Sequence, residues 1–108
     1  NPTGNPTGIQ NISTEIPSAF SLEQNYPNPF NPTSKIKYQI AKTQIKNQKV
    51  KLFVYDISGK EVAILVNQEQ EPGIYEAEFD GSNLSSGIYF YRLTTENFSD
   101  TKIFVLVK

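Results

Sequence analysis

The chain has 108 residues, with ten Lys and Arg against eleven Asp and Glu, and it contains neither Cys nor His. Without Cys there is no disulfide framework and no thiolate metal site, and without His the usual general base at neutral pH is missing. The net charge of −1 gives no global field that would attract nucleic acid or an anionic membrane. A chain of this length buries about two-thirds of its unfolded surface, so we expect one domain with a hydrophobic core. Because Cys and His are absent, we expect neither catalysis nor a cofactor.

Residues 1–19 are polar and are predicted to form a linker or the junction with an upstream domain. Asn1-Pro2-Thr3-Gly4 is repeated as Asn5-Pro6-Thr7-Gly8, and this density of Pro and Gly disfavours both helix and strand. The isoleucines that follow are too sparse for a core element of their own. Because the chain opens on Asn and has no basic-then-apolar leader, we expect a mature or excised piece without a membrane-inserted segment.

Residues 20–108 carry the pattern of a β domain. Seven short stretches of strand character are separated by turns, with no convincing helical period: residues 20–24, 34–40, 49–55, 60–66, 73–79, 87–93 and 99–108. A polar, acidic loop is expected over residues 67–72. The pattern predicts an all-β fold, a seven-stranded antiparallel Ig-like β-sandwich, with a small β-barrel as the alternative.

The stretch Asn25-Tyr26-Pro27-Asn28-Pro29-Phe30 interrupts this alternation. Each Pro fixes its own φ and restrains the preceding residue, which predicts an extended, kinked lead-in to the second strand. We expect Tyr26 and Phe30 to plug one end of the sandwich.

The last two strands are apolar on both faces. Residues 87–93 follow a turn-forming run, and their two aromatic-rich faces favour a position inside a sheet. In the tail, Ile103, Val105 and Val107 face one way and Phe104 and Leu106 the other. The tail can be a buried central strand, or an edge strand whose free backbone groups a partner reads by strand addition; the pattern is compatible with both.

Charged side chains recur two residues apart on two of the expected strands. Lys35 and Lys37, and separately Glu76 and Glu78, are predicted to point out of a sheet face. They indicate solvated faces with cross-strand pairs, or a polar contact surface for a partner.

Candidate metal and modification motifs in the chain are weak. Asp80-Gly81-Ser82-Asn83 offers oxygen ligands but lacks the spacing of a Ca²⁺ loop and a later bidentate Glu, so no metal site is predicted. Aromatic residues interleaved with Lys do not indicate a nucleic-acid platform in a slightly acidic domain.

Three blocks together carry a family resemblance: residues 20–32, ending in Asn-Tyr-Pro-Asn-Pro-Phe-Asn-Pro, residues 54–62, Val-Tyr-Asp-Ile-Ser-Gly-Lys-Glu-Val, and residues 80–93, ending in Gly-Ile-Tyr-Phe-Tyr-Arg-Leu. In this order they resemble the C-terminal sorting domain, type A, of the type IX secretion system of Bacteroidetes, over about Phe20 to Lys108. The chain is also similar in texture to the Ig-like domain of flagellar hook-capping proteins, which shares Tyr-Asp-Xaa-Xaa-Gly and Gly-Xaa-Tyr.

The sorting-domain resemblance implies a non-catalytic targeting module. Such a domain directs an upstream cargo from the periplasm across the outer membrane through the type IX translocon. A sortase then commonly removes it, leaving the cargo secreted or attached to the cell surface, and the cut would fall before Phe20. Position by position, the resemblance implies two motifs. The entry motif consists of Asn25, Tyr26, Pro27, Asn28, Pro29 and Phe30. The sorting motif consists of Gly87, Tyr89, Tyr91, Lys102, Ile103, Val105, Val107 and Lys108.

Two other functions are compatible with the residues. The domain can be a retained Ig-like structural module that assembles through its edge strands into a surface array or fibre, as the repeated Asn-Pro-Thr-Gly and the two-sided apolar tail suggest. It can also be an adhesive or sugar-binding module that uses exposed Tyr side chains.

Overall fold

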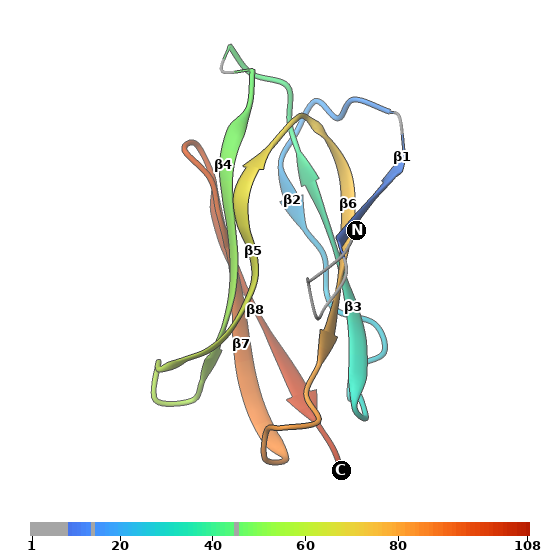
Figure 1. Ribbon diagram of the computed structural model, residues 1–108, viewed down its shortest axis with the longest axis vertical. Coiled ribbons are helices and arrows are strands. Elements are labelled where there is room, and N and C mark those ends of the chain that lie inside the picture. The colour runs from blue at the N-terminus through green and yellow to red at the C-terminus, as the bar shows by residue number, and fades with distance from the viewer. Residues whose placement is uncertain (1–8, 14, 45) are drawn as a thin grey trace.

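A computed structural model describes residues 9–13, 15–44 and 46–108. Two four-stranded sheets of antiparallel strands pack face to face, in the orders β1-β6-β3-β2 and β5-β4-β7-β8 (Figure 1). The strands are β1 (Ile9–Ser13), β2 (Ser21–Leu22), β3 (Thr33–Ile40), β4 (Gln48–Asp56), β5 (Glu61–Gln70), β6 (Gly73–Asp80), β7 (Gly87–Thr94) and β8 (Ser99–Leu106). The predicted β-sandwich is therefore confirmed, and the sheets do not close into a barrel.

The core lies between the two sheets and follows the predicted alternation. Every second side chain of β3, β4 and β7 is buried, as are Phe104 and Leu106 of β8, because successive residues of a strand point to opposite faces. The fully enclosed side chains include Ile36, Tyr38, Ile40, Val50, Leu52, Val54, Tyr91, Leu93, Phe104 and Leu106. Tyr75 of β6 is half-buried and stacks on Tyr38 with ring centroids 5.5 Å apart.

The expected seven strands become eight, because β1 lies inside the segment predicted as a linker. Its residues pair with β6, from Ile9 opposite Ala77 to Ser13 opposite Ile74. The middle of β1 is exposed and only Ile9 packs against the core. Backbone pairing along a sheet edge holds this strand, and a pattern of apolar residues cannot reveal such pairing. The Asn-Pro-Thr-Gly repeat lies outside the described residues.

The loop expected over residues 67–72 was also wrong in part. β5 continues through Asn67 to Gln70, where its residues pair with β4, as in Lys51 opposite Asn67 and Gln48 opposite Gln70. These side chains are mostly polar, so the extension again depends on backbone hydrogen bonds with a neighbour rather than on apolar alternation.

Sheet order decides between the central and the edge position that the sequence left open for the tail. β7 lies between β4 and β8, as its two apolar faces predict, whereas β8 is the end strand of its sheet. The tail is therefore an edge strand, although Phe104 and Leu106 are almost completely buried. The described residues contain no helix long and apolar enough to cross a membrane.

Candidate functional site

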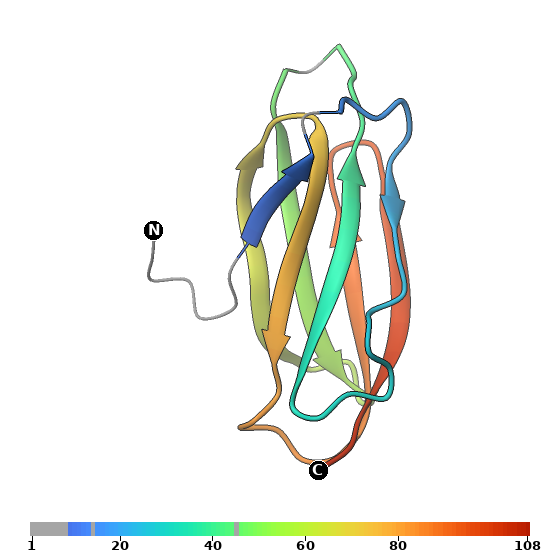
Figure 2. The ribbon, with the colours of Figure 1, turned by 90° about the vertical axis from the view of Figure 1, so that its right-hand side faces the viewer.

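The segment Asn25–Phe30, here called the proline block, lies along the outer edge of β8. Figure 2 shows the chain after β2 running down beside the red strand β8. The backbone N–H of Phe30 donates to the carbonyl of Val105 at 3.0 Å, and the N–H of Val107 donates to the carbonyl of Phe30 at 2.9 Å. The Asn28 side-chain oxygen accepts the N–H of Val105 at 3.0 Å.

A glutamine just before the block extends this cover. The side-chain amide of Gln24 donates to the carbonyl of Ile103 at 2.7 Å. Exposed edge strands invite pairing with other chains, and covering the edge with a loop prevents it. On the outer side of β8, the carbonyls of Ile103 and Val105 and the N–H groups of Val105 and Val107 thus already have intramolecular partners.

Tyr91 ties the proline block to the centre of the second sheet. The backbone N–H of Asn25 donates to the Tyr91 hydroxyl at 2.8 Å, and that hydroxyl donates to the carbonyl of Glu23 at 2.7 Å. The Asn25 side-chain amide donates in turn to the carbonyl of Pro27 at 3.0 Å and to Ser34 Oγ at 2.8 Å. Burial raises the pKa of Tyr91 above its ordinary value, so the hydroxyl keeps its proton and its donor role at neutral pH.

Only one of the two aromatic residues expected to plug the sandwich does so. Phe30 is 1% exposed and stacks on Phe104, with ring centroids 4.9 Å apart. Tyr26 is 81% exposed, so its expected burial was wrong. Its backbone exchanges two hydrogen bonds with Lys35, each 2.9 Å long, and side chains opposite each other in an antiparallel pair share a face. The exposed Lys35 marks that face as the solvent side.

The turn that launches β7 places Gly87 and Tyr89. Gly87 has a φ angle of 154°, which residues other than Gly rarely adopt. Tyr89 is buried and donates its hydroxyl proton to the carbonyl of Ser85 at 2.6 Å, which closes the turn onto its own strand. Hydrogen bonds from the Ser82 hydroxyl and N–H to Asp80 lower the pKa of that carboxyl.

The tail residues of the predicted sorting motif divide between two environments. Ile103 and Val107 are 52% and 46% exposed on the outer face, with Val105 half-buried beside them. Lys102 is half-buried and shares the inward-facing side of β8 with Phe104. Lys108 reaches back to the turn before β7, where its ammonium donates to the carbonyl of Ser82 at 2.5 Å.

Sequence reasoning missed Ser34 and Gln24 as members of this region, and it placed Phe104 in the tail without giving it a role. The ring of Phe104 lies at the centre of an aromatic cluster with centroid distances from 4.9 to 6.3 Å, formed by Phe30, Phe79, Tyr89 and Tyr91. Period-two alternation could have identified Phe104 as the buried side of the tail. No local signal could have identified Ser34 and Gln24, because their contacts depend on the path of the proline block across the fold.

The predicted charged pairs come together on the outer face of the other sheet. Lys35 lies opposite Glu78 and Lys37 opposite Glu76, and Lys35 Nζ is 3.9 Å from the Glu76 carboxylate. Opposite charges across two strands neutralise each other at an exposed site, where such pairs contribute little stability.

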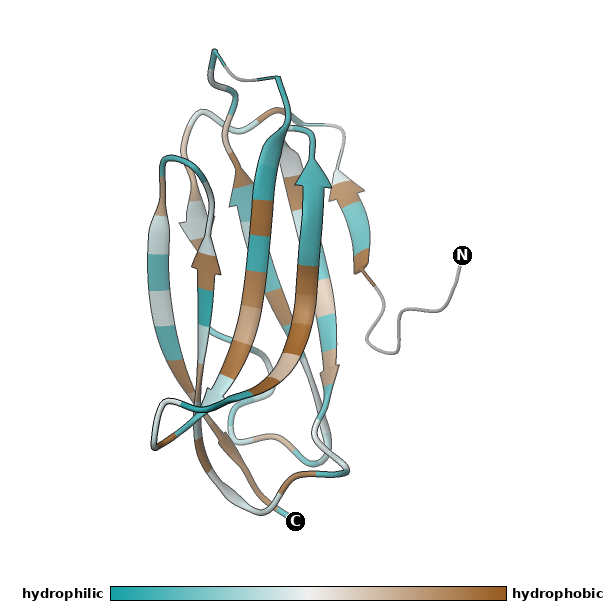
Figure 3. Cartoon of the chain, turned by 60° about the vertical axis from the view of Figure 1, so that its left-hand side comes forward, coloured by the Kyte–Doolittle hydropathy of each residue, from teal (hydrophilic) through white to brown (hydrophobic). Residues whose placement is uncertain are grey.

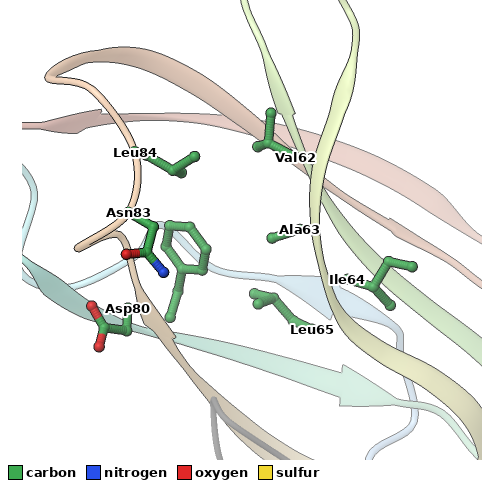
Figure 4. A pocket seen from close by; sticks show the side chains of 8 residues that line it. Val62, Ala63, Ile64, Leu65, Asp80, Asn83 and Leu84 are labelled. Carbon is green, nitrogen blue, oxygen red and sulfur yellow. The ribbon is translucent and has the colours of Figure 1, made fainter.

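A hollow of about 370 Å³ opens between β5 and the turn after β6. In Figure 4, Asn83 and Leu84 of the turn lie across from Ala63 and Leu65 of β5, and Asp80 lies at the rim. Most of its lining is apolar, with one carboxylate and one amide. Within the described part of the chain no cluster of three or more acidic, His or Cys side chains could hold a metal ion.

The first block covers the edge strand β8, while residues of the second and third blocks pair with each other as β4 and β7, and β7 in turn pairs with β8. The family model of the secretion system C-terminal sorting domain matches residues 24–107, so the chain belongs to this family. The match begins beside the proline block and ends in the tail. No curated protein and no solved structure matches the chain.

Membership defines what the protein does. Sorting domains of this family are non-catalytic targeting modules of the type IX secretion system, and they target a cargo for secretion across the outer membrane. The protein is thus part of a cargo that is secreted or attached to the cell surface of a Gram-negative bacterium.

Proposed function

We propose that the folded sandwich, rather than the tail as a free peptide, is the export signal. The observation that carries this proposal is the bonding between blocks far apart in sequence, from Tyr91 to Asn25 and from Phe30 to Val105. Those bonds hold the tail in one conformation. A partner that binds a preorganised surface avoids the entropy of ordering it.

The residues of the two motifs then have two roles. Gly87, Tyr89, Tyr91, Asn25, Pro27, Asn28 and Phe30 build and cover the strand pair, with Pro29 and Lys102 completing its framework. The side chains that a partner would contact are Ile103, Val105, Val107 and Lys108, together with the exposed ring of Tyr26. The burial of Tyr89, Tyr91 and Phe30 and the exposure of Ile103, Val107 and Tyr26 support this division.

The proposed partners are the translocon and a sortase that removes the domain. We assign residues 1–19 to the junction with the cargo and residues 20–108 to the sorting domain. A cut before Phe20 would separate β1 from the rest, and β1 pairs with β6 as its one neighbouring strand and packs only Ile9 against the core. The remaining sandwich would keep its aromatic cluster.

The test is a fusion of residues 20–108 to an exported reporter protein in a bacterium with a type IX system. We expect the reporter outside the cell, and the same reporter without the domain in the periplasm. Mass spectrometry of the released reporter, fused through residues 1–108, should find its new C-terminus within residues 1–19. A fused reporter that stays in the periplasm would contradict the proposed signal, and a reporter released with the domain intact would contradict the cut.

A further inference from the structure

The outer face of the sheet β5-β4-β7-β8 carries a continuous apolar band across all four strands. Tyr55 lies opposite Phe90, which lies opposite Ile103, while Ile88 faces Val105 and Phe53 faces Ile64. Figure 3 shows hydrophobic stretches side by side on the neighbouring strands of this sheet. The apolar band is defined as Phe53, Tyr55, Ile64, Ile88, Phe90, Ile103 and Val105.

The band is accessible to another molecule. Ile64, Ile88 and Ile103 are 49%, 47% and 52% exposed, and the three aromatic side chains are half-buried. Contiguous exposed apolar surface on a soluble domain marks an interaction site more often than scattered single residues do. The tail residues Ile103 and Val105 belong to it, so the band continues the proposed sorting motif onto β7, β4 and β5.

Two cations border this band with no carboxylate directly opposite them on the neighbouring strands, while Glu61 lies opposite Tyr55 and Glu96 lines a hollow together with Lys51. Lys51 lies opposite Asn67 and Thr94, and Arg92 lies opposite Phe53 and Thr101. On the other sheet, by contrast, Lys35 and Lys37 each face a Glu across β3 and β6. The charges of the polar face pair across its strands, whereas Lys51 and Arg92 have uncharged residues directly opposite and can pair with carboxylates of a partner.

The proline block and Gln24 oppose strand addition along residues 103–107, because they already bond the carbonyls of Ile103 and Val105 and the N–H groups of Val105 and Val107. A partner that reads the tail must therefore contact side chains on the exposed face of the sheet. A flat face that combines aromatic rings with Arg has the composition of a protein–protein interface.

We propose that the apolar band is the docking surface for a folded protein of the export machinery, whose contact surface is apolar and bordered by carboxylates near Lys51 and Arg92. The proposal rests on the export function and names its recognition surface. It assigns recognition to β4 and β7 as well as to the tail.

The test compares fusions of residues 1–108 to the same exported reporter. The variant Ile88→Thr with Ile103→Thr keeps β-branched side chains but removes apolar area, and its matched control is Ile12→Thr, 39% exposed on β1 of the other sheet. We expect the double variant to lower export about tenfold or more, as loss of two central interface side chains does, and the control to export like the parent. A second pair is Lys51→Glu against Lys46→Glu in the exposed loop before β4, with loss of export for the first alone.

The melting temperature of each purified 108-residue chain separates recognition from folding, and we expect values close to that of the parent. If the parent is exported and the band variants are exported equally well, the docking surface is wrong while the export function stands; if the parent itself stays in the periplasm, the export function fails. Two further results would contradict the proposal that the apolar band binds a protein of the export machinery. One is a dimer in light scattering that Ile88→Thr with Ile103→Thr dissolves, and the other is binding to anionic phosphatidylglycerol vesicles that the same variant abolishes.

Discussion

Tyr91→Phe tests whether the proline block is bonded to the core as described. The substitution keeps the ring, which is completely buried, and removes only the hydroxyl that accepts from Asn25 N–H and donates to the carbonyl of Glu23. Asn25 is 3% exposed, so its N–H would lose its partner away from water. Leaving a buried donor unsatisfied costs roughly 1–3 kcal/mol. The Glu23 carbonyl belongs to an exposed residue and can bond water instead, so we expect a loss of about 2 kcal/mol.

Thermal unfolding followed by circular dichroism measures this loss, which corresponds to a decrease in Tm of about 10 °C for a domain of this size. Two other Tyr→Phe variants supply the comparison. Tyr89→Phe removes one partly buried hydrogen bond to Ser85 and should cost about 1 kcal/mol. Tyr26→Phe changes a side chain that is 81% exposed and should leave Tm unaltered. Amide hydrogen exchange at Asn25 should become faster in Tyr91→Phe alone.

Equal melting of Tyr91→Phe and Tyr26→Phe, with unchanged exchange at Asn25, would refute the reasoning. It would mean that the proline block is not bonded to β7, and the proposal of a preorganised signal would lose its main support.

Three further predictions concern the same region. Tyr89→Ala should lower the free energy of unfolding by about 3 kcal/mol, because it leaves a cavity where a buried ring contacts Phe104. A denaturant midpoint equal to that of the parent would contradict this burial. Gly87→Ala should cost about 2 kcal/mol through backbone strain at φ of 154°. A Cβ there would meet no atom within 4 Å, so a steric clash would not contribute, and an unchanged Tm would contradict the strain. Hydrogen bonds from Ser58 and Ser82 lower the pKa of Asp56 and Asp80 below 3.8 in the folded state. The two ionised carboxylates therefore contribute their full stability above the pKa of the unfolded state, and this contribution is lost as the pH falls through the pKa of the folded state. Melts between about pH 5 and pH 2 should therefore fall less steeply for Asp56→Asn with Asp80→Asn than for the parent, and parallel curves would count against this.

The resemblance read from three blocks and the family match agree on the same region of the chain. The blocks begin at residue 20 and the match at residue 24. Each block is a run of turn residues or prolines beside aromatic strand residues, and this composition is local. Period-two alternation likewise separates the core-facing from the outward-facing side chains of β3, because burial of one sheet face requires it, whereas in β7 both faces are apolar and alternation alone names no core side.

Local pattern failed where one strand depended on another for its hydrogen bonds. β1 and the end of β5 contain few core residues, and they are strands because β6 and β4 supply backbone partners. Tyr26 was misplaced for the same reason, since its pairing with Lys35 turns its side chain to solvent.

The amino-acid sequence by itself determined the β class, the core alternation and the family, because these depend on composition and periodicity within a few residues. Only the tertiary structure decided that β8 is an edge strand, that the proline block covers that edge, and that Ile103 shares a face with Phe90 and Tyr55. Each of these results joins segments far apart in the chain. Hydrogen bonds and contacts across such distances are set by sheet order and register, which the whole chain must satisfy at once.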